Sequence, residues 1–250
     1  MSLFKISERF KSVQGEGVYA GTPMAFIRFV GCSVGKRICQ HCDTDFEAMH
    51  SWRGGGVLET TELLAWADDY THICLTGGEP LDQHPDALRS LIEMAGDDVM
   101  FHIESSGTVM PPTWLVDMLG FAKNRIWLCV SPKPGFLEDA VKLANEVKVI
   151  VPGLGTPESL RQLSKNMVKG VLSDETAKGL MHVYGDRDTF RWPEITDALR
   201  WARAGKTVFL QPRNARFDID ANNLRIVQDI VAANPSLRLS VQLHKLLKVQ

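Results

Sequence analysis

The chain has little cysteine and no apolar run of membrane-spanning length. Its 250 residues include five cysteines, an odd number, and three of the five lie within one short stretch. A secreted disulfide framework needs paired, dispersed cysteines, so this pattern favours a reducing cytoplasm, where clustered thiols hold a metal or do chemistry. The first residues, MSLFKISERF, also lack the apolar core of a signal peptide. We therefore expect a cytoplasmic protein that starts here and does not enter a membrane.

The chain also lacks an excess of charge of either sign. It carries 28 Lys and Arg residues against 30 Asp and Glu residues, a formal net charge of −2. This balance argues against partners held by bulk electrostatics, such as duplex DNA or an anionic membrane surface. With 44% apolar residues, the chain can instead bury a large core.

Short runs of β-branched and aromatic residues alternate with segments of helical spacing. The predicted strands cover residues 24–30, 72–77, 99–105, 126–131, 146–151 and 207–212, with one further candidate at 238–243. The predicted helices are TTELLAWADDY, HPDALRSLIEMAG, PEITDALRWARAG and DANNLRIVQDIVAAN. Alternation of this kind is typical of βαβ units with a parallel sheet, either open or curled into a barrel.

Polar and glycine-rich motifs follow five of these strands. They read GCS, TGGEP, ESSG, SPK and QPRN in chain order. Because the carboxyl ends of parallel strands meet at one rim, where α/β proteins carry their chemistry, these five loops predict a single site. Residues 152–190 fit the pattern least well, and we treat them as an atypical insertion in one domain that spans residues 1–250.

The three clustered cysteines, Cys32, Cys39 and Cys42, have the spacing C-x6-C-x2-C. A structural zinc site would need a fourth ligand, for which His41 or His50 is available. The alternative is a [4Fe–4S] cluster with three protein ligands and one iron left open to chelate a small molecule. The spacing leaves both hypotheses open, with a slight preference for the cluster.

The combination of motifs resembles the radical S-adenosylmethionine superfamily, in which a three-cysteine loop follows the first strand and G-G-E-P follows the second. More narrowly, FKSVQGEGVYAGTPMAFIRFVGC and CDTDF are similar to the 7-carboxy-7-deazaguanine synthase family of queuosine and deazapurine biosynthesis, as are ESSG, SPK, LQP and QLHKLLKVQ. The resemblance covers about residues 4–151 and 206–250. One departure is the cysteine loop, which is three residues longer than the usual C-x3-C-x2-C of the superfamily.

This resemblance implies an incomplete, distorted (β/α) barrel of about six parallel strands that forms a homodimer. It implies that Cys32, Cys39 and Cys42 ligate a [4Fe–4S] cluster whose fourth iron chelates S-adenosylmethionine, which is cleaved to a 5′-deoxyadenosyl radical and later regenerated. The residues implied for S-adenosylmethionine are His41, Asp43, Gly77, Gly78, Glu79, Ser105, Ser131, Pro132, Lys133, Gln211, Pro212, Arg213 and Asn214.

The resemblance also implies the substrate, 6-carboxy-5,6,7,8-tetrahydropterin, which is converted to 7-carboxy-7-deazaguanine with loss of ammonia. Thr44 would bind Mg²⁺ together with the substrate carboxylate, and a reducing partner such as flavodoxin would supply electrons. The residues implied for the substrate are Val13, Gln14, Gly15, Glu16, Arg28, Thr76 and, through its terminal carboxylate, Gln250.

Arg28 is the substrate residue for which the sequence itself gives a reason. An arginine inside the apolar strand AFIRFV must find an anion when it is buried, and its fork of donors suits a carboxylate. An internal salt bridge to a buried Asp or Glu is the alternative.

Two other hypotheses remain open for the whole protein. One is a radical enzyme that activates a glycine on a partner protein, which the QGEG motif and Arg28 disfavour. The other is a non-enzymatic zinc-binding module, which the balanced charge and the five converging loops disfavour.

Overall fold

The computed structural model describes residues 2–39, 42, 44–120, 125–151, 192–214 and 218–248. The predicted insertion at 152–190 lies outside these residues, so the single-domain prediction stays a prediction. The strands are β1 (Leu3–Val13), β2 (Pro23–Phe29), β3 (Gly56–Glu59), β4 (His72–Gly77), β5 (Met100–Ser105), β6 (Ile126–Val130), β7 (Glu146–Val151), β8 (Thr207–Pro212) and β9 (Leu237–Leu239).

The described strands form one nine-stranded sheet with the order β3-β1-β2-β4-β5-β6-β7-β8-β9. From β2 onward each strand is parallel to its neighbour, whereas β1 is antiparallel to both β2 and β3. The predicted count of about six strands was therefore wrong, because the described sheet has nine, of which seven are parallel, and the incomplete, distorted barrel is not confirmed. The extra strands arise at the two edges, where β1 and β3 precede β2 in the sheet order and the short β9 follows β8.

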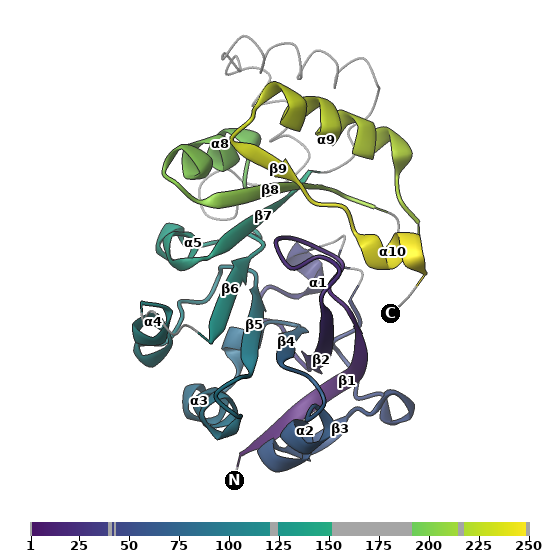
Figure 1. Cartoon of the computed structure of the whole chain (residues 1–250), viewed down its shortest axis with the longest axis vertical. Coiled ribbons are helices and arrows are strands. Elements are labelled where there is room, and N and C mark those ends of the chain that lie inside the picture. Colours follow the sequence, from purple (N-terminus) through teal and green to yellow (C-terminus); the bar gives the residue numbers. More distant parts are fainter. Residues whose placement is uncertain are drawn as a thin grey trace.

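The helices are α1 (Gly35–Ile38), α2 (Thr60–Trp66), α3 (Pro85–Met94), α4 (Thr113–Leu119), α5 (Glu138–Leu143), α8 (Ile195–Arg203), α9 (Ala221–Ala233) and α10 (Leu243–Leu247), with short 3-10 turns at Ser51–Arg53 and Pro80–Asp82. Helices α3, α4 and α5 follow one another along one side of the sheet (Figure 1). The loop between β1 and β2 and helix α10 lie on the other side. No helix in the described parts of the chain is long and apolar enough to cross a membrane.

The two faces of the sheet differ in composition because successive side chains of a strand point to opposite faces. The face toward the helices carries the main apolar core, with fully buried residues such as Ile27, Leu75, Ile103 and Val149. Their sequence neighbours point to the opposite face and include Arg28, Thr76, Glu104, Lys148 and Gln211, all of which line a cavity. The sheet thus separates the main apolar core from a cavity that charged and polar side chains border.

Local sequence explains where several helices begin. Helix α9 starts after Asp220, whose carboxylate accepts hydrogen bonds from the backbone N–H groups of Asn222 and Asn223, both at 3.0 Å. Helices α2 and α8 begin with reciprocal caps, formed by Glu59 with Glu62 and by Glu194 with Asp197.

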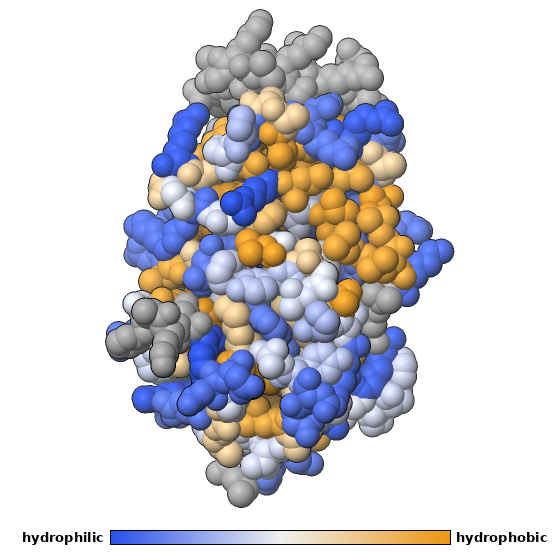
Figure 2. Space-filling model, in the orientation of Figure 1, coloured by the Kyte–Doolittle hydropathy of each residue, from blue (hydrophilic) through white to orange (hydrophobic). Residues whose placement is uncertain are grey.

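On the outer surface, exposed apolar residues gather around α10, where Leu246 and Leu247 are exposed (Figure 2).

Candidate active site

The polar face of the sheet lines a cavity of about 880 Å³. Most of the predicted site residues line it, and they come from loops that are far apart in the sequence. These residues are Val13, Gln14, Gly15, Glu16, Arg28, Cys32, Cys39, Cys42, Thr44, Thr76, Gly77, Gly78, Ser105, Ser131, Lys133, Gln211 and Arg213. The five strand-end loops therefore meet at one site, as the sequence predicted.

The three cysteines of the loop after β2 all reach this cavity. The residues that lengthen the loop form the short helix α1, which begins at Gly35 with a φ of 68°. Its turn brings the backbone N–H of Cys39 to the carbonyl of Gly35 at 3.0 Å, and the N–H of Cys42 to the carbonyl of Cys39 at 3.0 Å. The longer spacing is thus absorbed by one helical turn.

The Cys39 and Cys42 thiols lie close together. Their mutual hydrogen bond, followed by burial, raises the pKa of Cys39, and burial is the main reason that the pKa of Cys32 is raised. Ligation to iron would remove these protons, because a metal binds the thiolate.

The three thiols that reach the cavity supply the sulfur donors that an iron–sulfur cluster takes. Among the described residues, no group of three or more His, Cys, Asp or Glu side chains is placed to hold one metal ion. The imidazole of His50, one candidate for a fourth zinc ligand, lies 3.0 Å from Asp45 and does not line the cavity. His41, the other candidate, lies outside the described residues, as do Asp43 and Gln250.

The glycines of the G-G-E-P loop are required by the close approach of this loop to the cysteine loop. Gly77 has a φ of 120°, a conformation that side chains rarely adopt. A Cβ on Gly78 would collide with the carbonyl of Gly31, immediately before Cys32. The N–H groups of Gly78 and Glu79 bind the carbonyls of Phe29 at 3.2 Å and Gly31 at 3.1 Å. The two loops are therefore joined backbone to backbone.

Glu79 lies behind the cavity wall rather than in it. Its side chain is fully buried, and its carboxylate accepts hydrogen bonds from the N–H groups of Leu81 at 3.1 Å and Ser106 at 2.7 Å, and from the Ser106 hydroxyl. Burial raises the pKa of Glu79, and the Ser106 hydrogen bonds oppose this. In the described structure Glu79 thus joins the loops after β4 and β5, which is a positioning role.

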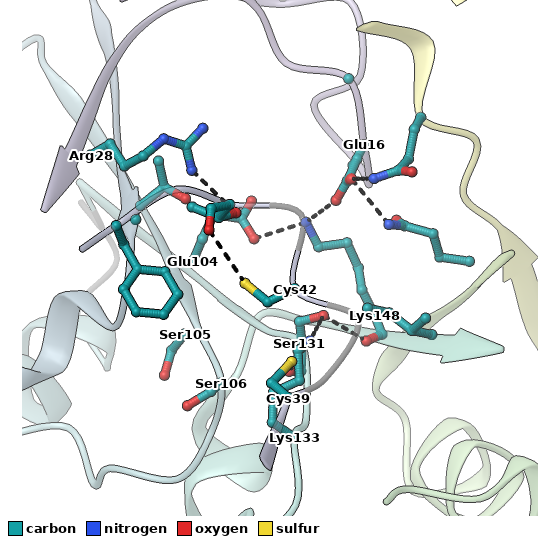
Figure 3. A pocket seen from close by; sticks show the side chains of 18 of the residues that line it. Glu16, Arg28, Cys39, Cys42, Glu104, Ser105, Ser106, Ser131, Lys133 and Lys148 are labelled. Carbon is teal, nitrogen blue, oxygen red and sulfur yellow. Dashed lines mark hydrogen bonds and ion pairs between the residues drawn. The ribbon is translucent and has the colours of Figure 1, made fainter. Parts of the chain in front are cut away.

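The loop after β6 brings a lysine to the cavity. The Lys133 ammonium donates to the carbonyl and hydroxyl of Ser131 at 3.0 and 3.1 Å, and the Ser131 hydroxyl donates to the carbonyl of Lys148 at 3.2 Å (Figure 3). Burial lowers the pKa of Lys133. Ser105, at the end of β5, accepts a hydrogen bond from the N–H of Gly107 at 3.1 Å.

The loop after β8 connects the cavity to the C-terminal segment. Asn214 donates to Gln242 at 3.0 Å, and the backbone N–H of Arg213 donates to the carbonyl of Val151 at 2.8 Å. Pro132, Pro212 and Asn214 do not line the cavity. Four of the cofactor residues that the resemblance implies therefore lie behind the cavity surface: Glu79, Pro132, Pro212 and Asn214.

The loop between β1 and β2 forms another wall. Glu16 accepts hydrogen bonds from Gln211 at 3.0 Å and Gln242 at 2.7 Å, and forms an ion pair with Lys148 at 2.8 Å. Burial would raise the pKa of Glu16, but Lys148, the Gln242 hydrogen bond and the charge of His244 lower it to about 2. Gln14 donates to Glu104 at 3.3 Å.

Arg28 has the internal salt bridge that was its alternative interpretation. Its Nε atom lies 2.8 Å from Glu8, and Arg53 contacts the other oxygen of Glu8, also at 2.8 Å. Two guanidinium groups thus share one carboxylate, and this trio keeps a net positive charge at the wall of the cavity. Arg28 also lies 3.5 Å from the hydroxyl of Thr44, so the residues predicted for the substrate carboxylate and for Mg²⁺ are adjacent.

Comparison with known proteins gives full-length relatives. The chain is 30% identical to the 7-carboxy-7-deazaguanine synthase of Bacteroides thetaiotaomicron over 98% of both chains. It is also 30% identical to that of Caulobacter vibrioides over 98% of both, and 33% identical to that of Bradyrhizobium diazoefficiens over 64% of this chain and 78% of the relative. No family model matches the chain.

The chain belongs to the 7-carboxy-7-deazaguanine synthase family. A solved structure of similar fold is the crystal structure of QueE from Escherichia coli, with a TM-score of 0.59, 24% identity and coverage of 96% of this chain and 94% of that chain. Membership of this family of enzymes favours the lyase hypothesis over the glycine-activating enzyme and the zinc-binding module.

Several charged residues that line the cavity of this family member were not predicted from the sequence, above all Lys148, Glu104 and Glu8. Each lies in a strand: Lys148 between two buried valines, Glu104 between a buried isoleucine and a buried serine, and Glu8 between a serine and an arginine. The signal that singled out Arg28, a charged residue inside an apolar strand, was also present in MFHIES and EVKVIV. Applied to every strand, it would have found Lys148 and Glu104.

Proposed function

We propose that this chain is a radical S-adenosylmethionine lyase that converts 6-carboxy-5,6,7,8-tetrahydropterin to 7-carboxy-7-deazaguanine with loss of ammonia. The observation that carries the proposal is the cavity, which is lined by the cysteine loop, by Gly77 and Gly78, and by Gln14, Glu16 and Arg28. A site for a redox cofactor and a site for a polar, anionic substrate therefore share one enclosed space in a member of this family.

The cofactor would occupy the side of the cavity near the cysteines. Cys32, Cys39 and Cys42 would ligate a [4Fe–4S] cluster, and the backbone at Gly77 and Gly78 would lie beside the methionine part of S-adenosylmethionine. When bound, this cofactor pair supplies the abstraction of a hydrogen atom from the substrate. Ser105, Ser131, Lys133, Gln211 and Arg213 would line the rest of the cofactor, together with His41 and Asp43.

The substrate would bind beside the cofactor, against Arg28, Thr44 and Thr76. The net positive trio of Arg28, Arg53 and Glu8 suits the pterin carboxylate, because a guanidinium binds a carboxylate through charge-assisted hydrogen bonds. Thr44, next to Arg28, offers a hydroxyl to Mg²⁺, which commonly takes few protein ligands and completes its shell with substrate and water. Thr76 lines the same region.

The remaining substrate contacts would come from the loop between β1 and β2. Val13, Gly15 and the side chains of Gln14 and Glu16 border the cavity, and they offer hydrogen-bonding groups to the edge of the pterin. In this proposal the carboxylate of Gln250 adds a further contact. A barrel-like closure around the substrate, a homodimer, a cytoplasmic location and a flavodoxin-type electron donor belong to the same proposal.

The decisive experiment is anaerobic reconstitution with iron and sulfide, followed by incubation with 6-carboxytetrahydropterin, S-adenosylmethionine, Mg²⁺ and a reductant. We expect 7-carboxy-7-deazaguanine, identified by mass spectrometry, and no net consumption of S-adenosylmethionine. The control is the variant with Cys32, Cys39 and Cys42 all changed to Ala, which should lose both the brown colour and the product. A colourless protein that binds one zinc ion would overturn the proposal.

A further inference from the structure

Lys148 is a buried cation that the proposed chemistry does not use. It lies on β7 and is 2% exposed, although its side chain borders the cavity. Burial of an unpaired ammonium is costly, so a lysine in this position needs anionic partners that compensate for the loss of water. Its partners therefore indicate what it does.

Two carboxylates from distant parts of the chain bind this one ammonium. Glu16, on the loop between β1 and β2, and Glu104, on β5, each place an oxygen 2.8 Å from the Lys148 Nζ atom (Figure 3). They are 132 and 44 residues away from Lys148 in the sequence. Because both oxygens contact the same nitrogen, the two carboxylates lie side by side, and both border the cavity.

Side-by-side carboxylates repel one another when both are ionised, and normally one of them takes up a proton. Here the Lys148 ammonium contacts both carboxylates, and its positive charge offsets their mutual repulsion. The pKa of Lys148 is raised well above its ordinary value, because the surrounding anionic groups outweigh the effect of burial. The pKa of Glu16 is lowered to about 2, despite its burial, chiefly by Lys148.

The rest of the surroundings keeps the carboxylates oriented. The second oxygen of Glu16 accepts hydrogen bonds from Gln211 and Gln242, and the second oxygen of Glu104 accepts one from Gln14. Other titratable groups that influence Lys148, Glu16 or both are Cys74, His102, Cys129, Lys133, Glu146 and His244. Among the described residues, Lys148 is the group that contacts both carboxylates.

We propose that Lys148 is a positioning residue that holds Glu16 and Glu104 together as two ionised acceptors for the N–H edge of the substrate. This inference rests on the proposed function, because a reduced pterin presents adjacent ring N–H and amino donors along one edge. A carboxylate accepts hydrogen bonds and donates none, so a pair of them selects a ligand edge that consists of donors.

The test compares wild-type protein with Lys148→Met, which keeps most of the side-chain volume and removes the charge. The dissociation constant of 6-carboxytetrahydropterin is measured by anaerobic equilibrium dialysis. The protein is reconstituted and supplied with S-adenosylmethionine and Mg²⁺ but no reductant, at several values between about pH 5.5 and pH 8.5. The matched control is Lys142→Met, because Lys142 is exposed and pairs with Asp139 on the surface of α5.

We expect Lys148→Met to bind the pterin at least about tenfold more weakly at pH 7, because one of the two acceptors is then protonated. The ratio of its dissociation constant to that of wild type should fall as the pH rises, since the shared proton is lost. Lys142→Met should match wild type throughout. The ratio cancels the titration of the pterin itself, because that titration is common to both proteins.

A second variant covers the case in which Lys148→Met does not fold. Lys148→Met combined with Glu104→Gln has one carboxylate and no cation, so its ratio to wild type should not vary with pH. If a variant that folds binds the pterin as tightly as wild type, Lys148 has only a structural role and the inference is overturned. The same holds if the ratio of dissociation constants for Lys148→Met does not change with pH.

A wild-type protein that fails to bind the pterin overturns the proposed function and this inference together. Wild-type turnover, with variants that bind the pterin like wild type, overturns the inference alone.

Discussion

Gly78 is the residue on which the shape of the cysteine loop depends most directly. A Cβ at this position would overlap the carbonyl of Gly31 and lie 3.0 Å from the Cβ of Cys32. One neighbour is the backbone carbonyl of Gly31 and the other is the Cβ atom of Cys32. Neither can move aside unless the backbone that carries the first cysteine moves as well. The glycine therefore sets the position of a predicted iron ligand from a different loop.

Gly78→Ala should lower the free energy of unfolding by about 1–3 kcal/mol, because the added methyl group forces the backbone of the cysteine loop apart. It should also reduce the iron bound per chain after reconstitution. Urea unfolding and an iron assay measure the two effects.

The matched control for this variant is Gly120→Ala. Among the described residues, a Cβ on Gly120 would meet only the carbonyl of Asp117, at 3.4 Å, so the change in stability should stay within about 0.5 kcal/mol. A Gly78→Ala protein that is as stable as wild type and loads iron fully would contradict the assigned role of Gly78.

At the scale of secondary-structure elements, the apolar strands were the most predictable part of the fold. The six main predicted strands correspond to β2, β4, β5, β6, β7 and β8, and the further candidate to β9. Their buried, β-branched residues give a strong local signal. Strand β1 was missed because its eleven residues mix charged and apolar side chains, and β3 was missed because it has only four residues.

The candidate site was predictable where it depends on the ends of strands, since parallel strands bring those ends together whatever the loops contain. It was not predictable where it depends on which face a side chain takes. Glu79 was expected to face the cofactor, but it turns into the protein to bind Ser106. Lys148 sits in the predicted strand 146–151, but its two partners are distant in sequence.

Strands β4 and β5 carry a pair of histidines that responds to pH. His102 lies 2.9 Å from His72, and the Tyr19 ring packs against both imidazoles. Burial, followed by the charges of His72 and Lys148, lowers the pKa of His102 from its ordinary value of 6.5 to about 3. Between these two pH values the folded protein binds fewer protons than the unfolded chain, so its stability falls as the pH falls.

His102→Gln should therefore make the stability of the protein less sensitive to acid. The free energy of unfolding, measured by urea denaturation between pH 7 and about pH 4.5, should decline less steeply than in wild type, by up to about 1.4 kcal/mol per pH unit. His84→Gln serves as the control, because His84 is exposed, and its curve should run parallel to that of wild type. Parallel curves for His102→Gln would show that His102 titrates normally in the folded protein.

At the scale of the whole molecule, the cavity depends on contact between segments near the two ends of the described chain. The N–H of Leu243 binds the carbonyl of Gly15 at 2.9 Å, and the N–H of Gly17 lies 3.3 Å from the Ser240 hydroxyl. A Cβ on Gly15 would collide with the ring of His244 and lie 3.1 Å from its backbone nitrogen. The absence of a side chain at Gly15 thus allows the C-terminal segment to lie against the loop between β1 and β2.

Gly15→Ala should raise the KM for the pterin about tenfold, because it displaces the loop that carries Gln14 and Glu16, while the strands remain folded. Adding His244→Ala removes the ring that the new methyl group meets and should restore part of this loss. Steady-state kinetics on the two single variants and the double variant give the coupling between the positions. Simple additivity of the two effects would contradict the contact, and far-ultraviolet circular dichroism checks that each variant is folded.

This contact has a consequence for biosynthesis. The cysteine loop and the loop of Gly77 and Gly78 are translated long before the segment that completes the wall beside Gly15, which lies more than 150 residues after Gly78. Pairing across such a sequence separation is slow to form. A nascent chain therefore exposes its three thiols well before the C-terminal segment covers the cavity, so the proposed cluster would be open to iron delivery before release from the ribosome.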